Sequence, residues 1–354
     1  MNEERLMATV QGAAGHLVGA AVATGVMLGD RLGAYRALSR SGPQTAAELA
    51  EMLGVNGRLL REWLDGQAAA GIVGYDPDDD TYDLSVEAAI VYADDTSPMF
   101  LARGYQGVTS IAVDIDKIEA AFRGDGGLPW EAHHHSLFHG IEWFFRTGYR
   151  AHLATEWIPS LDGVEPVLTA GCDVLDVGCG HGASLAVLAE AYPDSRFHGV
   201  DFHEPSIEIA RERVAAAGVG DRVALAVGDA TSYGGEYDLI CFFDCLHDLG
   251  DPVGAAAHAR AHLTEGGSVL LVEPFAMPDR VQNIAENPMA AASYHLSSMV
   301  CTPNSLSQDV GLALGSQAGA GRMAEVFADA GFGRFEQRME TPFNLIFQAK
   351  AATT

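Results

Sequence analysis

The chain has 354 residues, 48 of them acidic and 21 basic, which gives a formal net charge of −27 at pH 7. This charge disfavours nucleic acid and anionic membrane surfaces as partners, because both are bound largely through clustered Lys and Arg. The length favours two or three domains, and 48% hydrophobic residues without low-complexity tracts indicate a folded, soluble protein.

A run without charged residues, 6–29, is long enough to span a bilayer. It is, however, mostly Ala and Gly, contains polar residues and follows the acidic pair Glu3-Glu4. A signal peptide begins with basic residues and has a more apolar centre. Glycines spaced four apart suit close contact between helices, so we expect a buried or dimer-interface helix and no membrane partner.

The next segment contains short helices and then a hairpin. Thr45 and Glu48 form a capping-box signature, a second helix begins near Asn56, and strands are predicted over 72–75 and 81–84. A helix-turn-helix followed by a hairpin is the pattern of a winged helix.

DNA binding is the first function that a winged helix suggests. The second helix, however, presents only Arg58 and Arg61 outward, and the hairpin turn 76–80 carries four aspartates, which a phosphate would repel. We therefore expect no nucleic-acid partner and keep a DNA-binding regulator as the alternative.

Residues 97–160 are predicted to be helical and are rich in aromatic side chains, which suits a linker or lid over an apolar substrate. His133-His134-His135 and His139 suggest a metal site. Consecutive residues on a helix point about 100° apart, however, so at most His135 and His139 share a face. We predict no metal ligands in this protein.

The segment from Val174 to Gly182 is an apolar strand that breaks into alternating glycines, Gly178, Gly180 and Gly182, before a helix-like run. A strand that enters a helix through glycines lets a ligand approach the backbone and offers it free N–H groups. Asp201 ends the next apolar run and can accept both hydroxyl protons of a ribose. These spacings indicate a nucleoside cofactor.

The glycine loop also fits the relaxed dinucleotide fingerprint, so other residues must decide which cofactor is bound. Asp176 precedes the first glycine and suits a cationic ligand, whereas it would repel a pyrophosphate. A second acidic turn, Asp229-Ala230, follows the strand-like run 223–227.

With these three motifs the chain resembles the class I S-adenosylmethionine (SAM) methyltransferases. The resemblance implies that SAM is the cofactor and that Asp176 and the glycines flank its methionine part. It also implies that Asp201, followed by Phe202, binds the ribose and that Asp229-Ala230 receives the adenine.

From residue 173 onward, strands and helices alternate, which builds a parallel sheet with helices on both faces. Two final strands are predicted near 334–339 and 344–348. The resemblance implies a Rossmann-like, seven-stranded α/β domain that closes with such an antiparallel hairpin. We predict three parts: a helical, winged-helix domain (1–96), a helical linker or lid (97–160) and a SAM-binding catalytic domain (161–354).

Ligands of such sheets bind at the carboxyl ends of the strands. The fourth strand leads into Asp244, assigned to the cofactor, and then to His247 and Asp248. A hydroxyl acceptor must lose its proton, and His titrates nearest to neutral pH, so His247 is the candidate general base. Asp248, Asp244 or Glu273 would orient its imidazole, as in a catalytic triad. A histidine that merely caps the loop is the alternative.

Residues 274–318 form an insertion without strong periodicity, whose polar side chains suggest the acceptor-side wall of a pocket. We assign Tyr294, Cys301 and Gln308 to this wall, together with Tyr149. Cys301 as a nucleophile is an open alternative that the sequence does not support, because no basic residue lies near it along the chain. The five cysteines show no disulfide or metal-ligand spacing, which favours a reducing, cytoplasmic compartment.

His247-Asp248 and Glu273-Pro274 resemble winged-helix O-methyltransferases of natural-product metabolism, in which the histidine is the base and the winged helix is used for dimerisation. Leu249 stands where that family usually has Trp. A bacterial group of SAM-dependent methyltransferases, mostly of unassigned substrate, is similar over nearly the whole chain. The segments that carry this similarity are Glu62-Trp63-Leu64, Glu156–Pro159, Phe243–Asp248, Cys301–Pro303, Ser305–Gln308 and Thr341–Asn344.

These resemblances imply a homodimer that methylates a small apolar or aromatic acceptor, most often at oxygen. Two alternatives remain. One is a SAM-responsive winged-helix transcriptional regulator, and the other is a related enzyme that uses SAM for a reaction other than methylation.

Overall fold

The computed structural model describes residues 1–351, which divide into two compact units. One unit contains residues 1–113 and 134–147, and the other contains residues 114–133 and the chain from Gly148 onward. The segment predicted as one linker or lid, 97–160, thus contributes to both units. The domain boundaries at residues 96 and 160 stay predictions.

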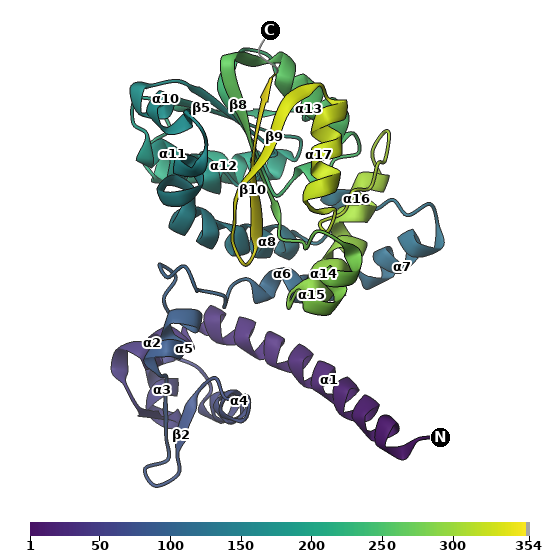
Figure 1. The fold of residues 1–354 in the computed structure, drawn as a ribbon. Coiled ribbons are helices and arrows are strands. Elements are labelled where there is room, and N and C mark those ends of the chain that lie inside the picture. Colours follow the sequence, from purple (N-terminus) through teal and green to yellow (C-terminus); the bar gives the residue numbers. More distant parts are fainter. Residues whose placement is uncertain (352–354) are drawn as a thin grey trace. The chain divides into compact units, whose positions relative to one another are not determined.

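The first unit is a winged helix extended by further helices (Figure 1). Its strands pair antiparallel in the order β1-β3-β2. The elements are α1 (Glu3–Leu32), α2 (Ala34–Ser41), β1 (Gln44–Thr45), α3 (Ala46–Leu53), α4 (Gly57–Ala69), β2 (Gly74–Asp76), β3 (Thr81–Asp83), α5 (Val86–Tyr92), α6 (Tyr105–Ser110) and α8 (His135–Gly148), with η1 (Ile111–Asp114) at the boundary. The predicted winged helix is confirmed.

Local signals in the sequence set these helix starts. Thr45 Oγ1 accepts a hydrogen bond from the Glu48 N–H at 3.3 Å, and Glu48 Oε2 accepts one from the Thr45 N–H at 2.9 Å, which completes the predicted capping box. Asn56 caps α4 through its side chain alone, which accepts hydrogen bonds from the Arg58 and Leu59 N–H groups. Tyr35 and Trp63 then pack edge to face in the core of this unit, with ring centroids 5.4 Å apart.

Both arginines that α4 presents outward are paired with carboxylates. Arg61 makes two hydrogen bonds, of 2.8 and 2.9 Å, to Asp80 in the turn of the wing. Arg58 forms an ion pair with Glu62, one helical turn away. These pairs offset the positive charge that a phosphate would need, which agrees with the charge argument against DNA binding.

The long helix α1 is buried mainly near its C-terminal end. Val26 and Asp30 are buried there, and Asp30 pairs with Arg36 at 2.8 Å and with Arg103 at 3.2 Å. The preceding turns are exposed in the single chain. By length and composition α1 could cross a membrane, which for one helix close to an N-terminus is weak support for such a role.

The second unit is an α/β domain. Its elements are α7 (Ile115–Arg123), η2 (Trp130–Ala132), η3 (Tyr149–Trp157), α9 (Ile158–Ser160), α10 (Val164–Ala170), β4 (Asp173–Val177), α11 (Ala183–Ala191), β5 (Arg196–Asp201), α12 (Glu204–Ala216), β6 (Val223–Val227), β7 (Tyr237–Phe243), η4 (Leu246–Asp248), α13 (Pro252–Ala261), β8 (Leu263–Pro274), α14 (Arg280–Glu286), α15 (Ala290–Leu296), η5 (Ser297–Cys301), α16 (Thr302–Leu306), α17 (Gly319–Asp329), β9 (Phe332–Glu340) and β10 (Asn344–Ala351).

Within the described residues, seven strands form one sheet in the order β6-β5-β4-β7-β8-β10-β9. The pairs from β6 to β8 are parallel, and β10 runs antiparallel to both β8 and β9. Helices α13 and α17 cover one face and share a hydrophobic core with Phe242 and Phe347 (Figure 1). The predicted Rossmann-like fold with its antiparallel closing hairpin is confirmed.

The insertion 274–318 is more ordered than its sequence suggested, since it forms α14, α15, η5 and α16. Two segments of the described chain, η3 and η5, are π-helices, in which the backbone hydrogen bonds run from i to i+5. Wide turns of this kind break the ordinary helical repeat of apolar residues, which explains why periodicity did not reveal them.

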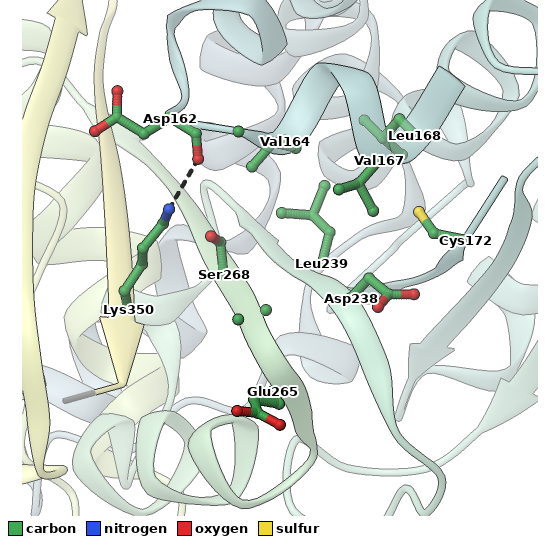
Figure 2. A pocket seen from close by; sticks show the side chains of 13 residues that line it. Asp162, Val164, Val167, Leu168, Cys172, Asp238, Leu239, Glu265, Ser268 and Lys350 are labelled. Carbon is green, nitrogen blue, oxygen red and sulfur yellow. Dashed lines mark hydrogen bonds between the residues drawn. The ribbon is translucent and has the colours of Figure 1, made fainter. Parts of the chain in front are cut away.

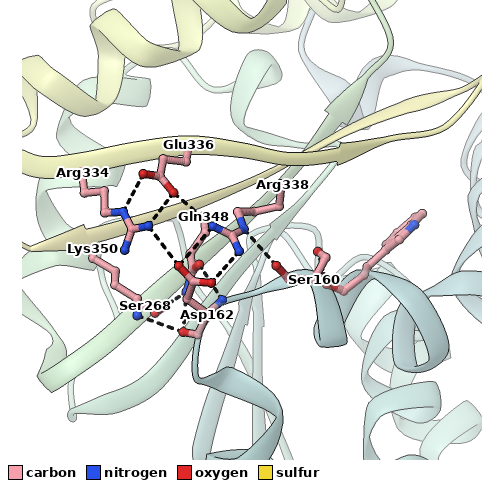
Figure 3. A network of polar contacts seen from close by, with 9 residues as sticks. Ser160, Asp162, Ser268, Arg334, Glu336, Arg338, Gln348 and Lys350 are labelled. Carbon is pink, nitrogen blue, oxygen red and sulfur yellow. Dashed lines mark hydrogen bonds and ion pairs between the residues drawn. The ribbon is translucent and has the colours of Figure 1, made fainter.

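Asp162 fastens the C-terminal hairpin to the segment that precedes β4 (Figure 3). Its carboxylate accepts hydrogen bonds from Arg338 at 2.6 and 3.1 Å and from Arg334 at 3.0 Å, and its backbone carbonyl accepts one from Lys350 at 2.9 Å. Bidentate pairing of this kind fixes orientation as well as distance. The antiparallel edge of the sheet is thereby tied to the helices before it.

Candidate active site

The glycine loop after β4 creates an open space at the carboxyl edge of the sheet. Gly178, Gly180 and Gly182 all have positive φ angles, of 73°, 50° and 69°. A Cβ at Gly178 would lie 2.9 Å from Cys245 Sγ, and one at Gly182 would lie 3.0 Å from Ala210 Cβ. At Gly180, by contrast, the described residues other than its two chain neighbours place no atom within 4 Å of the added Cβ. The loop therefore leaves room for a ligand at Gly180.

Asp176, at the end of β4, is fully buried and only half satisfied. Ser184 donates a hydrogen bond to Oδ2, whereas Oδ1 has no hydrogen-bond partner among the described residues. Burial raises the pKa of this carboxyl to about 7. A buried carboxylate oxygen without a donor is a suitable contact for a cationic group.

Asp201, at the end of β5, is hydrogen-bonded to the glycine loop. Its carboxylate accepts hydrogen bonds from the Gly180 and His203 N–H groups, both at 2.9 Å. Burial raises its pKa, although these two backbone donors oppose the shift. Each carboxylate oxygen can accept a second hydrogen bond, which leaves capacity for two hydroxyl groups.

The remaining residues assigned to the cofactor lie at the adjoining strand ends. Phe202 follows Asp201 and is 46% exposed. The Gly228 N–H donates to the Asp201 carbonyl at 3.0 Å, which brings the end of β6 beside the end of β5. Asp229 is exposed and accepts hydrogen bonds from Thr231, and Ala230 is partly buried.

These features together fit a ligand with a cationic group and vicinal hydroxyls, which are the features of SAM. Asp176 offers the unpaired oxygen, Asp201 offers the acceptors, and Gly180 provides the space. A pyrophosphate would be repelled by the two carboxylates.

Asp244 anchors a network at the end of β7. Tyr149 donates to Oδ2 at 3.0 Å, and Asn344 Nδ2 donates to Oδ1 at 2.8 Å. Burial raises the pKa of Asp244 well above its ordinary value. Its φ angle is +52°, a left-handed conformation that is unusual for a residue with a side chain and that persists only where the surroundings hold it.

His247 makes two contacts with the carboxylate of Glu273, the penultimate residue of β8. Nδ1 lies 2.5 Å from Glu273 Oε2, and the backbone N–H of His247 donates to Oε1 at 3.3 Å. Both side chains are 3% exposed. Burial lowers the pKa of the imidazole, but the charges of Glu273 and Asp248 outweigh it, so the pKa is raised well above its ordinary value. Of the carboxylates proposed to orient the imidazole, Glu273 is the one that contacts Nδ1.

The other ring nitrogen of His247 faces Asp248 and Cys301. Nε2 lies 3.3 Å from Asp248 Oδ1, and Cys301 interacts with both residues. The sequence argument about Cys301 considered only neighbours along the chain, and the fold brings a histidine to this thiol. Burial nevertheless raises the pKa of this thiol to about 11, which keeps it protonated near neutral pH.

Polar residues of α16 and its C-terminal end brace the loop that carries His247 and Asp248, and sequence reasoning assigned a role only to Gln308. Ser305 Oγ donates to the Leu249 carbonyl at 2.7 Å, and Asn304 Nδ2 donates to that of Asp248 at 3.2 Å. Gln308 bonds the Asp248 carbonyl and the Gly250 N–H. The polar run after Cys301 was the only signal of this clamp.

Two other predicted groups, Tyr294 and the histidine run, have contacts of their own. The Tyr294 hydroxyl accepts a hydrogen bond from Asn283 at 3.2 Å, within a polar network of the insertion. His133, in the second unit, is buried 3.5 Å from Asp114, and burial lowers its pKa. His135 and His139, in the first unit, have ring centroids 6.2 Å apart.

A shallow pocket lies at the opposite edge of the sheet, where β7 begins (Figure 2). Asp238, Ser268 and Cys172 line it, and a hydrogen bond of 2.9 Å from Lys350 to the Asp162 carbonyl borders it. Because ligands of parallel sheets bind at the carboxyl ends of the strands, we assign no role in the reaction to this pocket.

Comparison with known proteins gives matches to both units. Residues 175–269 match the family model of a methyltransferase domain, and residues 20–93 match that of the Rv2258c-like winged HTH domain. The 27-O-demethylrifamycin SV methyltransferase of Amycolatopsis mediterranei (strain S699) is 27% identical over 170 residues, which are 45% of this chain and 61% of that protein. The first curated relatives are matched over 23% to 61% of their own lengths.

Two solved structures share the whole fold. The mitomycin 7-O-methyltransferase MmcR has a TM-score of 0.66 at 20% identity, and the match covers 99% of this chain and 100% of that one. Human N-acetylserotonin methyltransferase in complex with SAM has a TM-score of 0.72 at 15% identity, with 98% of each chain covered. These likenesses extend over the winged helix and the α/β domain alike.

The buried acid Asp176 predicts a pH-dependent effect on stability. Its pKa in the folded chain, about 7, lies above the ordinary value of 3.8, so between these values the folded state holds one proton more than the unfolded state. The contribution of this group to stability therefore falls as pH rises from about 4 to 7. Asp176→Asn cannot ionise, so we expect its free energy of unfolding, relative to that of the wild type, to increase by roughly 2.5 kcal/mol between pH 5 and pH 8.

Urea unfolding of the cofactor-free chain at the two pH values measures this difference. Asp194→Asn, at an exposed position, is the control and should differ from the wild type equally at both. If the difference in free energy of unfolding between Asp176→Asn and the wild type does not grow with pH, the pKa of Asp176 is not raised in the folded chain.

Proposed function

We propose that this chain, a class I SAM-dependent methyltransferase with an N-terminal winged-helix domain, methylates a hydroxyl group of a small apolar or aromatic acceptor with His247 as the general base. The observation that carries the proposal is the buried His247–Glu273 pair, with 2.5 Å between Nδ1 and Oε2. It lies at the same sheet edge as Asp176 and Asp201. The names of the mitomycin and rifamycin relatives denote methylation at oxygen, which supports this choice of acceptor atom.

When bound, SAM supplies an electrophilic methyl group on a sulfonium. Asp176 and the loop from Gly178 to Gly182 would hold its methionine part, and Asp201 with Phe202 would hold the ribose. Asp229 and Ala230 would border the adenine, and Asp244 would complete this side of the site. The enzyme's largest contribution to such an in-line displacement is alignment of the two reactants.

In molecules whose Nε2 is unprotonated, His247 would accept the hydroxyl proton there as the methyl group is transferred. Because the pKa of His247 is raised, the fraction of molecules in this form grows as pH rises. Glu273 fixes the ring through Nδ1 and stabilises the imidazolium that forms, which is the role of the carboxylate in a catalytic triad. Asp248 lies beside Nε2 and would position the acceptor hydroxyl. Tyr149, Tyr294, Cys301 and Gln308 would belong to the acceptor side.

We also propose that the chain acts as a cytoplasmic homodimer. The exposed apolar side chains of α1, among them Leu6, Val10 and Leu17, would be covered by the second copy. Light scattering should then give twice the chain mass of 37.4 kDa, whereas the single mass would contradict the dimer.

Cofactor binding is tested by titration calorimetry of the full chain with SAM and with its demethylated product. Both should bind. We expect Asp201→Ala to weaken SAM binding roughly 10- to 100-fold, because hydrogen bonds to a charged group are lost. Asp194→Ala serves as the matched surface control. Absence of measurable binding of either compound to the wild type would end the proposal.

The role of His247 is tested with SAM carrying a radiolabelled methyl group and a panel of hydroxylated aromatic compounds. We expect His247→Asn to lower the transfer rate about 10²- to 10⁴-fold, as is usual for loss of a general base, without weakening SAM binding. His262→Asn, which lies just before β8 at the opposite edge of the sheet, should keep the wild-type rate. An unchanged rate in His247→Asn would show that alignment suffices or that another base acts.

A further inference from the structure

Three potential metal ligands converge on the acceptor side of His247. A ring nitrogen of His247, a carboxylate oxygen of Asp248 and Cys301 Sγ all lie within 4.8 Å of one another. They come from two separate segments, η4 and the last residue of the π-helix η5. The side chains of His247 and Asp248 are 3% and 17% exposed, and Cys301 is buried.

The cluster holds more carboxyl groups than its single imidazole can balance. Asp248 Oδ1 is buried 3.3 Å from His247 Nε2, yet within the described residues it has no hydrogen-bond partner. Asp244 and Glu273 are also buried close by, so three carboxyl groups surround one imidazole. Such a cluster is costly unless protons or a cation neutralise it.

We infer that His247, Asp248 and Cys301 form a binding site for a soft divalent cation, with Zn²⁺ as the best fit. Sulfur, imidazole nitrogen and carboxylate oxygen are the ligands that zinc takes in proteins, and three protein ligands with one open position are typical of reactive zinc sites. Bonds of about 2.0–2.3 Å in a tetrahedron place the ligand atoms roughly 3.3–3.8 Å apart. From separations of up to 4.8 Å, the three groups would need to approach one another by at most about 1.5 Å to reach this spacing.

Glu273 contacts the ring nitrogen of His247 that does not face the other two ligands. A histidine that binds a metal through one ring nitrogen usually donates its other N–H to a carboxylate, which fixes the tautomer and the orientation of the ring. Here Nδ1 is bonded to Glu273 Oε2, so Nε2 is the nitrogen directed at Asp248 and Cys301.

The cation site goes beyond the proposed function and does not require it, whereas its effect on methyl transfer rests on the proposed role of His247. A metal on Nε2 would take the nitrogen that receives the acceptor's proton, so the metal-loaded chain and the chain with a free base are alternative states. Zinc would therefore act as a reversible inhibitor of methyl transfer.

Cobalt replaces zinc in such sites and absorbs light when a thiolate is among its ligands, so a Co²⁺ titration of the chelator-treated full chain tests the site directly. We expect one equivalent to bind and to give a thiolate-to-cobalt charge-transfer band in the near ultraviolet, which one equivalent of Zn²⁺ removes. Cys301→Ser should lose the band. Glu273→Gln should keep it with affinity reduced roughly 10- to 100-fold.

Cys172→Ser is the matched control, because Cys172 precedes β4 and contacts Ser195 instead. It should keep the band and the affinity of the wild type. A wild-type chain without the band, or a band that survives in Cys301→Ser, would overturn the inference. Neither SAM nor an acceptor is present in this measurement, so its failure would leave the methyl-transfer proposal standing.

Discussion

The buried contact between His247 and Glu273 is the interaction on which the geometry of the candidate site depends. It forms because β7 and β8 are parallel and in register, with Phe243 opposite Val272, so that the loop after one strand meets the end of the other. The Asp244 N–H donates to the Val272 carbonyl at 2.8 Å and holds the carboxyl ends of the two strands together. An imidazole and a carboxylate can both be this deeply buried only because each compensates the other. The clamp from Asn304, Ser305 and Gln308 then fixes the far side of the same loop.

Much of the fold was predictable because its signals are local. The capping box at Thr45, the acidic ends of β4 and β5 and the glycines between them depend on residues a few positions apart, and backbone sterics translate them directly into turns. The parallel sheet followed from the alternation of strands and helices. With the sheet in place, Asp176, Asp201 and His247 were expected at one edge, and they lie there.

The parts that sequence reasoning missed depend on contacts between distant segments. The approach of Cys301 to His247 and the hydrogen bonds from Tyr149 and Asn344 to Asp244 join residues far apart along the chain. No spacing rule reaches that far. Spacing rules for metal ligands likewise describe ligands on one element, whereas here η4, after β7, and η5, in the insertion, would each supply part of the set. The roles of all these side chains stay proposals.

The two π-helices have a consequence for how such a site could diversify. A π-turn holds about one residue more than an α-turn, so that removal of a single residue restores a regular α-helix and shifts the side chains of that turn, while the turns on either side keep their orientation. In η3 and η5 such a deletion would swing Tyr149 or Cys301 relative to the sheet and leave the strands undisturbed. Lengthening or shortening these helices by one amino acid is therefore a route to a new cavity shape that no single exchange of side chains could provide.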